Sequence, residues 1–491
     1  MAVGPLVQSL PPYPTRAGVL TTRVDTGRPE RTCGVDTVRG RLSPTAILAM
    51  VAAAVFLTVA NTSASAVSQP AIAATFGAGP ADVGWVVFGY SGTFAVATAL
   101  YGRLAARFGL GRTLSFGILL LAFGSLVAVV APTLPAVIAA RVIQGAGSGA
   151  IPTLSVAILA TRFPSPKRQF AYGIITAVVG VAQALGPMIG GLLVDLISWR
   201  AAVAIGMLIS PVAAFIWYDL PQRGDPAHRL DYAGAGSVLL MIGGFVYAIN
   251  RVPMDGATLL TGGAVIIAAL GAVLTASRAK RHPAPFIPRS VVCDRGFLPL
   301  AIAAFVGSAS YLGTIVALPS ALSRVYEIDA VGIGLVIVPA AASVAVASTV
   351  NSVAVRRLGH AATTLASLLF LLVGTGLLAA LGIERGLGSV ALMVIPLGIG
   401  FGLLTPPLVD AVTKRFEGTS QSIAIGVFYL GFFLGGSSGG ALATGIIQRD
   451  LSIPLLGSGF PVGEAGLTAV ALAGAVMMAR ILIRNPRRVD A

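Results

Sequence analysis

The chain has 491 residues, of which 56% are hydrophobic and only 10% are charged. A soluble chain carries about a quarter charged residues, so this composition excludes a soluble globular protein and indicates a polytopic helical membrane protein. The formal net charge of +15 would suggest nucleic acid as the partner of a soluble chain. Here the basic residues gather at the ends of apolar spans, so we expect the lipid bilayer and no nucleic acid.

Residues 1–43 are rich in Pro, Thr and Arg and contain neither a short apolar core nor a small-residue cleavage site. They predict a disordered cytoplasmic tail and not a signal peptide. The two cysteines, Cys33 and Cys293, lie far apart in segments that we place in the cytoplasm. We therefore expect no disulfide.

Apolar stretches of about 20 residues, bounded by charges, Pro or Gly, follow one another along the remaining chain. They predict an all-α protein of about 14 transmembrane helices. The expected spans are 44–68, 82–103, 113–131, 134–162, 170–194, 199–219, 231–250, 258–277, 297–322, 330–352, 361–382, 388–413, 419–446 and 464–484.

The positions of the cations predict the orientation of these helices. With the N-terminus inside, the outer side keeps only Arg200, Arg251, Arg324, Arg385 and Arg449, and the other loop cations and both tails fall inside. Basic residues accumulate on the cytoplasmic side of membrane proteins. Both termini are therefore expected in the cytoplasm. The bias toward Arg, Ala, Gly and Val favours a bacterial inner membrane.

A weak internal repeat divides the chain. The segment Ala105-Ala106-Arg107-Phe108-Gly109 follows the second helix, and Val355-Arg356-Arg357-Leu358-Gly359 follows the tenth. The repeat predicts two six-helix bundles, 44–219 and 297–484, separated by a linker at 220–296 with two extra transmembrane helices and followed by a cytoplasmic tail at 485–491. We expect the extra pair, at about 231–277, to lie outside both bundles and to line no cavity.

An arginine interrupts the fourth apolar span, in Arg141-Val142-Ile143-Gln144-Gly145. Helical spacing places Arg141, Gln144 and Ser148 on one face, and Gly145 and Gly149 leave the neighbouring strip flat for close helix contact. An ionisable side chain at membrane depth nearly always faces a bundle interior or a wet cavity. We interpret Arg141 as part of a central polar site. The alternative is a structural arginine bonded to backbone carbonyls.

Two further stretches combine glycine with charge or proline. The loop after the second helix contains Gly102, Arg103, Arg107, Gly109 and Arg112, which permit a tight turn with carbonyl or phosphate contacts. The fifth helix carries Gln183 and then Gly186-Pro187-Met188-Ile189-Gly190-Gly191. This pattern predicts either close helix packing or a hinge, and the two are compatible.

Together these stretches resemble the signature motifs of the major facilitator superfamily. The resemblance covers about residues 44–484 and is closest to the 14-helix drug:proton antiporter branch, with its tetracycline-type exporters. It implies a gating role for the loop after the second helix and an antiporter role for the Gly-Pro motif of the fifth. The chain departs from the family at Asn61, where an acid is usual, and at Ala106, where Asp is usual.

The first helix keeps a polar stripe of Thr58, Asn61, Ser65 and Ser68. Because buried polar groups need partners in lipid, we expect the stripe to face a cavity opposite Arg141. The alternative is that the hydroxyls bond back to carbonyls of their own helix. Asp410, followed by Lys414, is expected to form an interfacial ion pair and is the best remaining candidate for a proton carrier in the second half.

These patterns predict an efflux transporter that exports an amphiphilic small molecule, an antibiotic or other natural product, by alternating access driven by protons. The missing acids favour an anionic or zwitterionic substrate beside Arg141. A tetracycline or metal-cation antiporter is an alternative, and so is a sensor or lipid-handling protein without ion coupling. Without paired carboxylates, a metal cluster or an activated nucleophile, we expect no enzyme, no metal and no cofactor.

The orientation can be tested at Cys293. In a Cys33→Ser variant, a membrane-impermeant maleimide should label Cys293 in inside-out vesicles and not in intact cells, because the positive-inside rule places this segment in the cytoplasm. Labelling in intact cells would contradict the topology.

Overall fold

The computed structural model describes residues 42–78, 80–219, 231–255, 258–282, 285–328, 330–416, 419–448, 452–453, 457–458 and 460–484. The expected tails lie outside these residues, except for positions 42 and 43. Cys33 lies outside them as well. Within them, thirteen helical segments are long and apolar enough to cross a membrane. This confirms the all-α membrane class.

The first half is a series of helices broken where proline removes a backbone donor. Pro70 and Pro152 each lack the N–H that would continue a helix, and the first and fourth predicted spans are divided near them. The elements are α1 (Pro44–Val67), α2 (Gln69–Phe76), α3 (Pro80–Phe108), α4 (Leu110–Val130), α5 (Leu134–Ser148), α6 (Ala150–Arg162), α7 (Ser165–Leu196), α8 (Trp199–Ala204), the 3₁₀ helix η1 (Ile205–Ile209) and α9 (Ser210–Asp219).

The second half follows the linker helices and contains one very long helical segment. The linker elements are α10 (Tyr232–Asp255), α11 (Leu259–Arg281) and the short α12 (Arg289–Val292). The second half comprises α13 (Phe297–Tyr326), α14 (Ala330–Leu381), α15 (Leu387–Arg415), α16 (Thr419–Gln448) and α17 (Phe460–Arg484). The spans expected at 330–352 and 361–382 form the single segment α14, interrupted at Gly359. This is why thirteen segments replace the expected fourteen.

The internal repeat is visible in the backbone. Gly109 has φ 89° and ψ 155° at the start of α4, and Gly359 has φ 84° and ψ 167° inside α14. A residue with a Cβ avoids this region, so glycine allows both sharp turns. Two turns of one conformation at matching places support the prediction of related halves.

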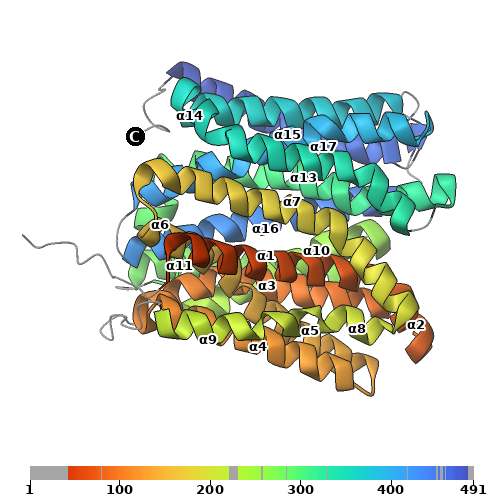
Figure 1. The fold of residues 1–491 in the computed structure, drawn as a ribbon, viewed down its shortest axis with the longest axis horizontal. Coiled ribbons are helices and arrows are strands. Elements are labelled where there is room, and N and C mark those ends of the chain that lie inside the picture. Colours follow the sequence, from red (N-terminus) through yellow and green to blue (C-terminus); the bar gives the residue numbers. More distant parts are fainter. Residues whose placement is uncertain are drawn as a thin grey trace, which may run out of the picture. The chain divides into compact units, whose positions relative to one another are not determined.

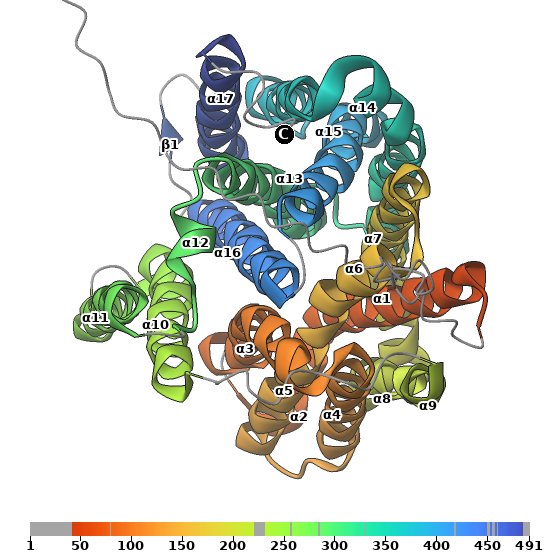
Figure 2. The ribbon, with the colours of Figure 1, turned by 90° about the vertical axis from the view of Figure 1, so that its left-hand side faces the viewer.

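The halves contact each other along two seams, where α7 packs on α14 and α3 packs on α16. Figure 1 shows α7 beside the second-half helices, and Figure 2 shows α16 opposite α3. Both seams have glycine at close approaches. A Cβ on Gly173 would collide with the Ser348 carbonyl, and one on Gly102 would collide with the Ser422 carbonyl. The halves therefore meet nearly backbone to backbone.

The extra pair lies beside these seams. The helix α10 packs on α3, α16 and α11, and Figure 2 shows α10 and α11 at one side of the other helices. The outer face of α11 is strongly exposed, with Leu259 at 93% and Ile266 at 69%. Such apolar exposure suits contact with lipid.

The segment before the last helix is shorter than expected. The last span was expected at 464–484, but α17 begins at Phe460, and the short strands β1 (Ser452–Ile453) and β2 (Gly457–Ser458) pair antiparallel before it. Glu464 consequently lies inside a helix and not at its boundary.

A pair of glycine substitutions tests the packing. A Cβ on Gly147 of α5 would collide with the backbone of α4 at Leu121 and Gly117, whereas one on Gly236 of α10 would meet nothing within 4 Å. We expect Gly147→Ala to destabilise the protein by about 2 kcal/mol and Gly236→Ala to leave it unchanged or slightly more stable. Melting temperatures in detergent check this, and equal values for the two variants would contradict the close contact.

Candidate functional site

Arg141 is fully buried in the first half, on the face of α5 turned toward α3. Its Nε donates to the Val86 carbonyl at 3.2 Å, and its Nη1 donates to Oε1 of Gln144. The guanidinium also lies over the Tyr90 ring, 4.3 Å from its centroid. Arg141 and Gln144 lie on one face of α5, as predicted, and the hydrogen bond between them is accompanied by backbone and ring contacts.

Gln144 connects Arg141 to two further helices. Its Nε2 donates to Ser125 Oγ in α4 at 2.9 Å and to the Val203 carbonyl in α8 at 3.1 Å. Ser148 does not extend this network, because its hydroxyl bonds back to the Gln144 carbonyl. Arg141 and Gln144 thus join α3, α4 and α8 around α5.

The glycines beside Arg141 permit these contacts. A Cβ on Gly145 would collide with Tyr90 and Thr93 of α3, and one on Gly149 would meet Ala97. The predicted flat strip is therefore confirmed. It brings α3 close enough for the Val86 carbonyl and the Tyr90 ring to reach the guanidinium.

The charge of Arg141 has no acidic partner among the described residues. The neighbours that it contacts are a carbonyl, an amide and a ring, all of which stabilise a cation without neutralising it. A buried charge that is not neutralised is costly, so Arg141 is well placed to attract an anion if the surrounding helices open.

The polar stripe of α1 is mostly satisfied within its own helix. Thr58, Ser65 and Ser68 donate to the carbonyls of Ala54, Asn61 and Ala64 at 2.6–2.8 Å, which is the alternative interpretation of the stripe. Asn61 differs. It is fully buried, and neither amide atom has a hydrogen-bond partner among the described residues. No hydrogen bond joins Asn61 to Arg141 there, so the two do not form one site in this conformation.

The Gly-Pro motif packs α7 against α1. A Cβ on Gly186 would collide with Ser63, and one on Gly190 would collide with Ala64. Pro187 lies inside α7, which continues without a break. Gly191 is buried on the same helix. These contacts support the packing role and leave the hinge as a prediction.

Gln183 lies one turn before this motif and is partly buried. Its Oε1 has no hydrogen-bond partner among the described residues. An unsatisfied amide oxygen on α7, the helix that forms one seam, is available to a ligand that carries a donor.

The residues predicted to form a loop after the second helix lie mostly in helices, because α3 continues to Phe108 and α4 begins at Leu110, with Gly109 alone between them. Gly102 lies on the α3–α16 seam, and Gly109 makes the turn into α4. Arg107 lies over the Phe108 ring, and Arg112 is exposed. Arg103 is buried at 4% exposure, where the resemblance to the family implies a gating role.

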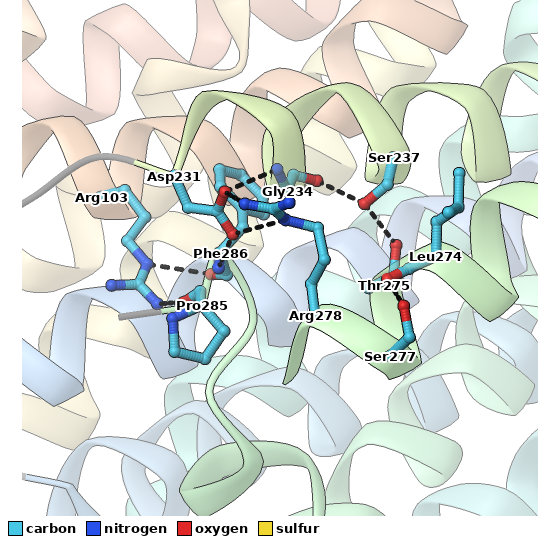
Figure 3. A network of polar contacts seen from close by, with 10 residues as sticks. All are labelled: Arg103, Asp231, Gly234, Ser237, Leu274, Thr275, Ser277, Arg278, Pro285 and Phe286. Carbon is cyan, nitrogen blue, oxygen red and sulfur yellow. Dashed lines mark hydrogen bonds and ion pairs between the residues drawn. The ribbon is translucent and has the colours of Figure 1, made fainter. Parts of the chain in front are cut away.

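Arg103 connects this loop to the linker after the extra pair (Figure 3). Its Nε donates to the Phe286 carbonyl at 2.9 Å, and its Nη2 donates to the Pro285 carbonyl. The Phe286 N–H donates to Asp231 Oδ2 at 3.1 Å. Asp231 also accepts from Arg278 Nη2 at 2.5 Å. One network thus joins α3, α10, α11 and the 285–286 segment.

Asp231 was not among the residues singled out from the sequence. Burial raises the pKa of its carboxyl, but the hydrogen bonds from Arg278, Gly234 and Phe286 outweigh burial and lower this pKa below its ordinary value. The signal was an acid at the first position of the span predicted at 231–250, where capping is common. Its arginine partner lies in another helix, which the sequence could not reveal.

Asp410 lies near the end of α15 and is almost fully buried. Its Oδ2 accepts from Lys414 at 2.8 Å and lies 3.0 Å from His360 Nε2. The pair with Lys414 was predicted. His360, which follows the Gly359 bend, was missed because its contact joins α14 to α15 across fifty positions.

A cavity of about 190 Å³ lies between α3 and α10. The rings of Trp85 and Tyr247 lie across it with centroids 5.5 Å apart, and Thr93 and Arg251 contribute polar atoms. The prediction that the extra pair lines no cavity is therefore wrong for α10. The space exists because Gly92 and Gly243, which both line it, have no side chains to fill it.

Polar and ionisable side chains buried between membrane-spanning helices are typical of membrane proteins that move solutes. Residues 51–440 match the family model described as Major Facilitator Superfamily, and the chain belongs to this superfamily. It is a multi-pass membrane protein and not an enzyme.

Characterised relatives support this assignment. The chain is 27% identical over 413 residues to the drug efflux pump JefA of Mycobacterium tuberculosis, covering 82% of this chain and 80% of that protein. It is also 27% identical over 414 residues to the tetracenomycin C resistance and export protein of Streptomyces glaucescens, covering 82% and 76%. The crystal structure of the human organic anion transporter MFSD10 (TETRAN) shares the fold, with TM-score 0.64 and 14% identity over 89% of this chain and 100% of that one.

Acid should weaken the Asp231 network. Because the folded pKa of Asp231 is lowered, the ionised carboxylate stabilises the protein above the ordinary Asp value of about 4, and this contribution is lost as pH falls through the folded pKa. We expect Asp231→Asn to lower the melting temperature by about 3 °C at neutral pH and to match wild type in strong acid. Asp195→Asn, at an exposed acid, is the control. A deficit that persists unchanged in acid would contradict the ionic role.

Proposed function

We propose that this protein exports an amphiphilic small molecule, an antibiotic or other natural product, across the inner membrane of a bacterium by alternating access. The names of its relatives, a drug efflux pump and an antibiotic resistance and export protein, support this substrate class. Membership of a transporter superfamily supports the mode of action.

The observation that carries the proposal is the pair of seams between the halves. At α7–α14 and at α3–α16, glycine allows the backbones of the two halves to approach closely. Across the first seam, Gln169 and Asn351 make only a long hydrogen bond of 3.4 Å. Surfaces of this kind can separate at one end and close at the other without unfolding a core.

We further propose that the substrate is anionic or zwitterionic. The support is the buried Arg141, whose charge no described acid neutralises. A carboxylate would accept two parallel hydrogen bonds from the planar guanidinium. Gln183 and Asn61, both with unsatisfied amide atoms, could orient other polar groups of the substrate when the helices rearrange. Protons are the proposed coupling ion.

Transport by reconstituted protein tests the charge preference. We expect proteoliposomes to accumulate norfloxacin, which carries a carboxylate, under an imposed pH gradient, in preference to the permanent cation ethidium. Arg141→Ala should reduce norfloxacin transport at least about tenfold, equivalent to about 1.4 kcal/mol. Arg141→Lys should restore little, because an ammonium cannot replace the planar fork. Asn61→Asp should weaken transport by supplying an internal competitor.

The melting temperature separates this role from a purely structural one. If Arg141 serves only to join α3, α4 and α8, Arg141→Ala should lower the melting temperature and reduce transport of both compounds equally. Binding of ethidium alone, unchanged in Arg141→Ala, would overturn the charge preference. Binding without transport by wild type would favour a sensor.

A further inference from the structure

Glu464 is a carboxylic acid buried in the second half, in the first turns of α17. Its side chain is completely shielded from solvent. Oε2 accepts a hydrogen bond of 2.8 Å from Thr314 Oγ1 in α13, and Oε1 has no partner among the described residues. The sequence analysis did not single out Glu464, because it placed this residue at the first position of the last span, where an acid is expected to meet water.

The helices packed against α17 bring no cation to this carboxyl. They are α13, α14 and α16, with β2 at the end. The described part of α16 contains no charged residue, and neither does β2. Arg324 lies in the last turn of α13, more than two turns beyond Thr314, and Arg480 and Arg484 lie at the opposite end of α17. The charged and titratable groups of α14 are Arg356, Arg357 and His360, and they adjoin the Gly359 bend. The part of α14 near Glu464 lies further along the helix, since Thr468, one turn after Glu464, contacts Gly376.

The nearby phenols are engaged elsewhere. Tyr311 stacks on Phe401 with centroids 4.1 Å apart, and Tyr326 donates to the Ile383 carbonyl. Tyr429 packs among the phenylalanines of α16. Among the described residues, Thr314 is the one side chain that hydrogen-bonds to the carboxyl of Glu464.

This environment differs sharply from that of Asp410. Lys414 supplies Asp410 with a positive partner, and His360 lies within hydrogen-bond distance of the same oxygen. A carboxylate without a cation in an apolar interior costs far more than a neutral carboxyl, so such a group takes up a proton. Glu464 is suited to carry a proton while it is enclosed and to release it when water reaches it.

We propose that Glu464 is the proton-binding group of the transport cycle. In the conformation shown, its carboxyl is neutral, with Thr314 fixing its orientation. When α13 and α17 separate and admit water, the carboxyl O–H releases its proton to the solvent and leaves the carboxylate. Reprotonation allows the helices to close again. This proposal rests on the proposed proton-driven export.

Glu464→Gln tests the proposal because glutamine keeps the shape and cannot titrate. In proteoliposomes, this variant should lose norfloxacin accumulation driven by a pH gradient and should retain exchange of labelled for unlabelled norfloxacin at equal pH. Glu384→Gln, at an exposed acid between α14 and α15, is the matched control and should behave as wild type. Gradient-driven accumulation at the wild-type rate in Glu464→Gln would overturn the proposal.

Two further measurements separate titration from structure. Purified wild type at neutral pH should show the infrared carbonyl band of a protonated carboxylic acid, and Glu464→Gln should lose it. Thr314→Val should move the midpoint of the pH profile of transport by about one unit, whereas Thr314→Ser should not. Absence of the carbonyl band in wild type would refute the neutral carboxyl. Failure of wild type to transport in either mode would instead refute the proposed function.

Discussion

The packing of the first half depends on the buried guanidinium of Arg141, which has no acidic partner among the described residues. Lipid offers no hydrogen-bond partner, so everything that Arg141 requires must come from neighbouring helices. The Val86 carbonyl, the Gln144 amide and the Tyr90 ring meet that requirement. They can do so only because Gly145 and Gly149 let α3 approach α5 closely. The contacts of Arg141 therefore depend on Gly145 and Gly149, and a larger side chain at either glycine would move α3 away from the guanidinium.

The extra helices are connected to the transport core and do not merely accompany it. Arg103 belongs to the loop that the family resemblance marks as a gate, yet it holds the backbone at Pro285 and Phe286, next to the ion pair of Asp231 with Arg278. The helix α10 also closes a cavity against α3. A movement of α3 relative to the linker must therefore rearrange this network.

The two buried acids of the second half have opposite electrostatic settings. Asp410 lies between a lysine and a histidine, whereas Glu464 has a single hydroxyl and apolar helices around it. Paired titratable groups whose environments differ in this way are typical of proteins that move protons. In the first half, Asn61 stands where the family resemblance implies an acid. The proton coupling that we propose therefore depends on the acids of the second half.

The sequence by itself determined the class, the motifs and most helix positions, because lipid demands long apolar spans whose ends carry cations. It also predicted that Arg141 and Gln144 share a helix face and that Asp410 pairs with Lys414, which follow from helical spacing alone. Tertiary structure decided what spacing cannot reach. The partner of Asp231, the contact of His360 with Asp410 and the enclosure of Glu464 all join helices distant in the chain. So does the cavity at α10, since it depends on which faces pack together and not on any local pattern.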